Sequence, residues 1–217
     1  DDQEEAAAAT LELINRQSTG NLPKQLMDPR WMVSAWEKTA QIADKYNDPG
    51  KFSALIGYEF TPNPGGGNNL HRNVIYRDGA DLAVQELPLT SFQTMDPEKL
   101  WEWMEKYEAN TGGKLLAIPH NGNLSNGRMF EGPTSNGGPM TKAYAEARQK
   151  WEAVFELTQT KRQSVSHPML SPTDEFAAGY ELWDRGNLTL VPKKPGMIAH
   201  EYLREALKNG LLLDQQL

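Results

Sequence analysis

The sequence predicts an α/β protein with largely parallel strands and surrounding helices. Apolar runs of strand length alternate along the 217 residues with segments of helical periodicity. This alternation is typical of a parallel sheet whose strands are joined by helical crossovers. The two longest loops, 121–140 and 159–174, both follow predicted strands. In parallel α/β proteins, functional sites lie in the loops that follow the strands, at the carboxyl ends of the strands.

Five segments predict helices. The first, 4–17, is rich in alanine and carries acidic residues in its first turn. Two others begin with an Asp-Pro pair, at Asp28 and Asp96, where aspartate is a good N-cap and proline suits the first helical position. The last two are 141–151 and the amphipathic stretch 196–211, which Asn209-Gly210 is expected to end.

Four apolar segments predict strands, at residues 52–60, 70–76, 114–120 and 152–159. The loop that joins the first two, TPNPGGGNN, has no helical pattern. We therefore expect 70–76 to be the exception to the parallel arrangement, because parallel neighbours need a longer crossover.

Composition excludes several classes of protein. The net charge of −7 argues against general nucleic-acid binding, which needs a basic face. No apolar run approaches the roughly 20 residues of a membrane span, and no basic run would hold an anionic bilayer surface. Cysteine is absent, so a metal would have to be held by His, Asp or Glu.

His120 is the most suggestive of the four histidines. It follows the apolar strand LLAIP and precedes Asn121-Gly122-Asn123, whose amides would bind a ligand or orient a metal-binding side chain, while the glycine permits close backbone approach. The competing interpretation is an ordinary Asn-Gly turn with the imidazole bonded to a carbonyl. His200 falls in the terminal helix and is expected at its surface or in packing.

Glu59 and His71 are the other two candidates. A carboxylate at the end of the apolar run ALIGYEF is costly unless it is paired or binds a metal; the alternative is a salt bridge to Arg72. His71 follows GGGNNL, which matches no phosphate-binding glycine motif. The loop would deliver His71 and Arg72 to a cleft, or leave both in solvent as part of a flexible connection.

Together, Glu59, His71 and His120 form an oxygen and nitrogen ligand set suited to zinc, manganese or iron. Such an ion acidifies water and polarises phosphoryl or carbonyl oxygens. The three residues lie far apart in the sequence and lack the compactness of an HExxH motif.

Three long segments carry a resemblance to a known family: FSALIGYEFTPNPGGGNNLHRNVIYRDGAD, LLAIPHNGNLSNGRMF and WEAVFELTQTKRQSVSHPMLSPTDEF. They resemble the central part of the family catalogued as domain of unknown function 3604, which is similar to the PHP (polymerase and histidinol phosphatase) metal-dependent hydrolases. The similarity runs from about Leu26 to the C-terminus. It implies part of a distorted (β/α)7 barrel with two or three divalent ions at the carboxyl ends of its strands.

The resemblance also implies roles for individual residues. Glu59 matches the glutamate of a Gly-x-Glu motif, and His71 and His120 match the next two metal-binding histidines. Asn121 stands where many PHP proteins have proline. If the chain is such a hydrolase, Arg72 and His167 are the groups expected to act in catalysis, by steadying negative charge on the substrate. The residues expected to bind substrate are Asn69, Asn121, Asn123, Lys161 and Arg162.

The family's other histidine motifs are absent, since no two histidines here are separated by one residue. Residues 1–217 are therefore expected to form a single incomplete PHP-like domain, with 1–25 as a helical extension. Its partners would be a small anionic ester and either the missing parts of the domain or a second copy of the chain. The family's members are often exported, which favours an extracytoplasmic location.

The expected function is that of a metal-dependent, phosphoesterase-like hydrolase that uses metal-activated water. This prediction concerns the full-length protein and leaves open whether the present segment is active alone. Two alternatives remain at this point. One is a non-catalytic module that binds an anion or a sugar through its Asn/Gly-rich loops, and the other is an inactive fragment without the full metal site.

Overall fold

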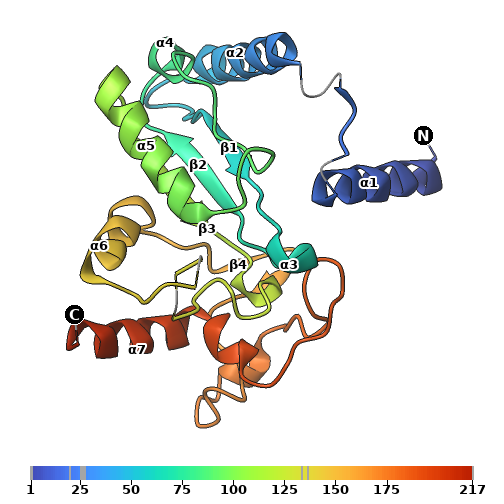
Figure 1. Cartoon of the computed structure of the whole chain (residues 1–217), viewed down its shortest axis with the longest axis vertical. Coiled ribbons are helices and arrows are strands. Elements are labelled where there is room, and N and C mark those ends of the chain that lie inside the picture. The colour runs from blue at the N-terminus through green and yellow to red at the C-terminus, as the bar shows by residue number, and fades with distance from the viewer. Residues whose placement is uncertain (1, 20, 25–27, 133, 136, 217) are drawn as a thin grey trace.

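A computed structural model of the chain describes residues 2–19, 21–24, 28–132, 134–135 and 137–216. Leu26, where the family resemblance begins, lies outside these residues, as does part of the segment predicted as a helical extension. The helix expected at 4–17 is present as α1 (Gln3–Ser18), and it stands apart from the rest of the molecule in Figure 1. Among the described helices, none has the length and apolarity that crossing a bilayer requires.

The two Asp-Pro signals predicted helices correctly. In α2 (Pro29–Tyr46) the side chain of Asp28 accepts a hydrogen bond from the Arg30 N–H, and in α5 (Pro97–Thr111) Asp96 accepts one from Glu98. α6 (Lys142–Trp151) is also confirmed. Short helical turns complete the first part of the described chain: α3 (Pro64–Gly67), α4 (Ala80–Ala83) and the 3₁₀ turn η2 (Gly122–Leu124).

The prediction of a largely parallel sheet within a (β/α)7 barrel is wrong. The main sheet has three strands, β1 (Gly57–Phe60), β2 (Arg72–Tyr76) and β3 (Leu115–Pro119), in the order β1-β2-β3. Both pairings are antiparallel. The fold is mixed α/β with small antiparallel sheets.

The segment between β2 and α5 explains the antiparallel pairing of β2 with β3. After β2 the chain returns along the sheet. This path is shown by two contacts near the end of β1, of Ser91 with Thr61 and of Met95 with Asn63. α5 then runs back to the other end, where the Arg77 N–H bonds to Lys114 O. This additional pass reverses the direction of β3 relative to a simple strand-helix-strand crossover.

The predicted strand at 152–159 is also wrong. These residues are irregular up to a two-residue strand, β4 (Thr158–Gln159), which pairs in a small hairpin with β5 (Arg162–Gln163). A backbone hydrogen bond from the Glu156 N–H to Pro119 O joins this segment to the edge of β3.

The predicted C-terminal helix is divided and longer than expected. The 3₁₀ turns η3 (Ala177–Gly179) and η4 (Met197–His200) precede α7 (Leu203–Asp214). α7 continues through Asn209-Gly210, which the sequence predicts as its end. A glycine inside a helix costs only about 1 kcal/mol, and here it does not stop the helix.

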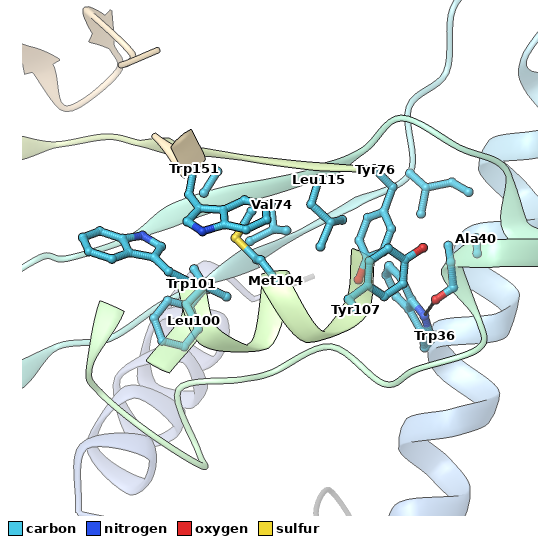
Figure 2. Close-up of a cluster of buried hydrophobic side chains, with 14 residues drawn as sticks. Trp36, Ala40, Val74, Tyr76, Leu100, Trp101, Met104, Tyr107, Leu115 and Trp151 are labelled. Atoms are coloured by element: carbon cyan, nitrogen blue, oxygen red, sulfur yellow. Dashed lines mark hydrogen bonds between the residues drawn. The ribbon is translucent and has the colours of Figure 1, made fainter. Parts of the chain in front are cut away.

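The hydrophobic core lies between one face of the sheet and helices α2, α5 and α6. Alternate residues of β2 and β3 are buried on this face, and the side chains of α5 cover them (Figure 2). The cluster contains Trp36, Val74, Tyr76, Leu100, Trp101, Met104, Tyr107, Leu115 and Trp151. The strand residues between these buried ones point to the other face of the sheet. They are only half-buried or exposed, so a site can form on that face.

Candidate metal centre

Glu59, His71 and His120 meet at one end of the main sheet. Glu59 lies on β1, His71 immediately precedes β2 and His120 immediately follows β3. In this antiparallel arrangement the end of β1, the start of β2 and the end of β3 share one edge. The His120 N–H donates to the carbonyl of His71, which continues the β2–β3 pairing by one residue.

Strand alternation places the three side chains on the same face. In the register Phe60 lies opposite Arg72, and Arg72 opposite Pro119, and these three residues are buried on the core side. Their neighbours Glu59, His71 and His120 therefore project to the other side. Each residue of the cluster is thus one position away, along its strand, from a residue that faces the core.

The ligand atoms lie at distances that fit one divalent ion. Glu59 Oε1 is 2.9 Å from His71 Nδ1 and 3.0 Å from His120 Nε2. All three atoms lie within 4.8 Å of one another, the only such His, Asp or Glu group found among the described residues. Ligands bound at about 2.0–2.2 Å to the same ion are themselves about 3 Å apart, so these residues fit a metal such as zinc.

Burial differs among the three side chains. The His71 side chain is 13% exposed and that of His120 5%, whereas Glu59 is 44% exposed and gives the group an open side. The contacts with His120 Nε2 and His71 Nδ1 hold the pKa of Glu59 well below its usual range. Burial lowers the pKa of His71, although its contact with Glu59 acts in the opposite direction.

Two of the alternatives drawn from the sequence do not hold in this structure. Glu59 is not paired with Arg72, because the Arg72 Nε donates to Glu152 at 2.8 Å on the core side. His71 and Arg72 are not in solvent either, since the Arg72 side chain is 3% exposed. Arg72 also donates to the carbonyl of Leu70. The predicted catalytic arginine is therefore held in the core and is not brought to the cluster.

Asn69 and Asn123, predicted to bind substrate, make hydrogen bonds within the protein. Both are fully buried. Asn69 Oδ1 accepts the backbone N–H of His71 at 3.1 Å. Asn123 accepts from Ser164 and donates to the carbonyl of Lys161 at 2.9 Å. Their side chains therefore position the histidine segment and the β4–β5 hairpin.

The conformation of the loop after His120 depends on Asn121 and Gly122. Asn121 adopts a left-handed conformation with φ of 55°, and neither atom of its buried amide has a partner within the described chain. A side chain at Gly122 would place its Cβ 2.4 Å from the carbonyl oxygen of Glu201. The expected close backbone approach at this glycine is confirmed.

Lys161 and Arg162, also predicted to bind substrate, lie at the turn of the β4–β5 hairpin. Lys161 is close enough for its charge to contribute to the lowered pKa of His71. Arg162 is instead paired with Glu181 at 2.6 Å, and both side chains are exposed. Lys161 Nζ itself donates to Gln159 Oε1 at 3.3 Å, and the effect of its charge is the weakest of those on His71.

The remaining two histidines lie outside the cluster. His167, predicted to be catalytic, is buried against Tyr202, and its Nδ1 accepts the N–H of Met169. Its Nε2 is 3.5 Å from Asp184. His200 contacts the carbonyl of Phe130 through Nδ1, and it belongs to η4, not to the long terminal helix.

Sequence reasoning missed Asn63, whose Oδ1 lies 2.9 Å from His71 Nε2. Asn63 belongs to the loop TPNPGGGNN, where the only available signal was a composition rich in amides and glycine. Such a composition does not show which amide will reach the histidine.

The comparisons with known proteins agree with part of the sequence resemblance. The profile of one family, described as "Protein of unknown function (DUF3604)", matches residues 1–217. No curated protein and no solved structure matches the chain. The match extends over the whole sequence, and so the chain belongs to the DUF3604 family.

Proposed function

We propose that this chain carries a metal-dependent hydrolase centre of PHP type that acts on small anionic esters. The observation that supports it most directly is the convergence of Glu59 Oε1, His71 Nδ1 and His120 Nε2. One carboxylate and two imidazoles form a ligand set used by catalytic zinc sites, which bind the ion through three protein groups and keep one position open.

The exposure of Glu59 is consistent with a catalytic site. Structural metal sites are closed by four protein ligands, whereas a catalytic site must admit water and substrate. His120 is buried and His71 mostly so, which fixes the inner side, and the half-exposed carboxylate leaves the outer side accessible. A divalent ion held there would supply Lewis-acid activation of water and of an ester oxygen.

The charge of the centre favours an anionic substrate. One carboxylate and two neutral imidazoles leave a divalent ion with one uncompensated positive charge. Lys161 adds a second positive charge near His71. In this proposal Lys161 binds the negative group of the ester, and Asn123 holds the backbone of Lys161 in place through its carbonyl.

Metal content and hydrolysis together test the proposal. Purified protein, loaded with zinc or manganese and desalted, should retain metal and hydrolyse p-nitrophenyl phosphate, and a chelator should abolish hydrolysis. Glu59→Ala, His71→Ala and His120→Ala should each lose most of the bound metal. His200→Ala is the matched control, because it removes an imidazole outside the cluster.

Two results would contradict the proposal. If the three alanine variants retain as much metal as His200→Ala, the cluster is not the metal centre. If phosphate binding survives complete removal of metal and no hydrolysis is seen, the chain is the non-catalytic anion-binding module that the sequence also allowed.

A further inference from the structure

The amide of Asn63 is held at both ends, which fixes the direction in which it faces His71. Its Nδ2 lies 3.2 Å from the backbone carbonyl of Thr61, and its Oδ1 lies 2.9 Å from His71 Nε2. A backbone carbonyl only accepts hydrogen bonds, so the amide nitrogen must point toward Thr61. The amide oxygen therefore points toward the imidazole.

This orientation determines which nitrogen of His71 carries the proton. The amide oxygen is an acceptor, so His71 Nε2 must donate and must be protonated. A neutral imidazole has a single N–H, and its Nδ1 then presents a lone pair. That nitrogen faces Glu59 Oε1 at 2.9 Å, where two acceptors would repel each other unless a cation lies between them.

Asn63 is available for this contact because its side chain does not cap a helix. It occupies the N-cap position of α3, where asparagine usually accepts a backbone N–H of the first turn, but no such bond is formed. Its backbone N–H contacts the sulfur of Met95 at 3.4 Å, and Pro64 follows it. The backbone is thus anchored while the amide is directed to His71.

We propose that Asn63 is a positioning residue that fixes the Nε2–H tautomer of His71 and so makes Nδ1 the metal-binding nitrogen. The inference rests on the proposed function, because the lone pair of Nδ1 can face Glu59 at this distance only when an ion lies between them. Metal-binding histidines generally donate their second ring N–H to an oxygen, and loss of that partner typically weakens metal binding about 10–100-fold.

The tautomer is measured by ¹⁵N NMR of the imidazole nitrogens at pH 8 in protein saturated with zinc, with His71 assigned by comparison with His71→Ala. Wild type should show protonated Nε2 and unprotonated Nδ1. Asn63→Ala should shift His71 toward a mixture of tautomers, and Asn63→Asp, which retains an acceptor oxygen, should restore the wild-type pattern. A wild-type His71 protonated at Nδ1 would overturn the inference.

Zinc affinity, measured by competition with a chromophoric chelator, provides the second readout. Asn63→Ala should bind zinc about 10–100-fold more weakly than wild type, and Asn63→Asp should stay within a few-fold of wild type. Asn68→Ala is the matched control, since it removes an amide of the same loop that bonds to Asn187 and not to His71. Circular dichroism verifies that each variant is folded.

The outcomes separate this inference from the proposed function. If wild type binds no zinc, the proposed metal centre fails, and the inference about Asn63 fails with it. If wild type binds zinc but Asn63→Ala binds it as tightly as Asn68→Ala does, the metal centre stands and Asn63 has no positioning role.

Discussion

At the scale of single residues, the centre depends on one carboxylate oxygen shared by two imidazoles. Glu59 Oε1 contacts both His71 and His120, and the two rings are nearly perpendicular, at 87°. Each nitrogen therefore approaches the oxygen from a different direction. The three atoms lie within 4.8 Å of one another, close enough to share one ion.

Replacement of Lys161 tests whether the centre attracts anions. In Lys161→Met the inhibition constant of inorganic phosphate against p-nitrophenyl phosphate hydrolysis should rise about three- to tenfold, because one positive charge beside the centre is lost. Metal content should not change. Lys114→Met, at the opposite end of β3, is the control. Equal inhibition constants in the two variants would show that Lys161 does not bind the anion.

The sequence indicated the residues of the cluster but not the neighbouring residues that hold them in place. A carboxylate ending an apolar strand and a histidine following Pro119 are unusual enough to mark Glu59 and His120 as candidates. Asn63 and the burial of Arg72 depend on how a loop folds back and on which side of β2 faces the core. An offset of one residue decides this, and sequence patterns do not resolve it.

At the scale of secondary structure elements, a buried ion pair connects β2 with the end of α6. Glu152 accepts from Arg72 at 2.8 Å and from the Trp101 indole at 3.0 Å. The side chains of Glu152 and Arg72 are 2% and 3% exposed. This pair secures the residue next to His71 to the helical layer, and so it holds one side of the centre in place.

Removal of Glu152 should be strongly destabilising. Glu152→Ala leaves Arg72 charged and buried without its partner, which should lower the free energy of unfolding by about 3–5 kcal/mol. Glu105→Ala, which breaks the exposed pair with Lys150, should cost no more than about 1 kcal/mol. Urea titration of both variants measures this contrast, and similar losses in the two would contradict a dominant role for the buried pair.

Helices were easier to predict than strand pairing because their signals are local. The Asp-Pro pairs and the amphipathic pattern lie within each helix and need no knowledge of the remaining chain. The direction of β3 depends instead on the path of residues 77–96, whose return along the sheet has no counterpart in strand or helix periodicity. The path of this segment is also the reason why the parallel barrel expected from the family resemblance was wrong.

At the scale of the whole molecule, the C-terminal segment is tied to the loop that follows His120. Lys193 Nζ lies 2.7 and 2.8 Å from the two carboxylate oxygens of Glu201 and donates to the carbonyl of Asn123 at 2.7 Å. Glu201 also accepts the N–H of Gly127. Burial raises the pKa of Glu201 to about 7, against the opposing effect of Lys193.

This shift predicts how stability changes with pH. The folded-state pKa of about 7 lies above the ordinary value of 4.5, so the folded protein binds more protons between these values. The stabilisation linked to Glu201 is therefore complete below pH 4.5 and is lost as the pH rises through 7. Glu201→Gln cannot ionise and should lack this dependence.

Urea titrations of wild type and Glu201→Gln from pH 4.5 to 8 measure it. The difference in free energy of unfolding, wild type minus variant, should fall across this range and level off above pH 7. A difference that grows with pH would mean that the ion pair with Lys193 outweighs burial and lowers the pKa of Glu201.

The pairing of β2 with β3 has a consequence for how the protein refolds. Sliding β3 by one residue against β2 would turn His120 toward the core and bring Pro119 to the opposite side. Only chains whose strands have paired in the native alignment would then present both imidazoles to the same ion. During renaturation, the fraction of protein able to retain zinc would therefore report the fraction whose strands are natively aligned. This fraction can be followed separately from the recovery of helix content.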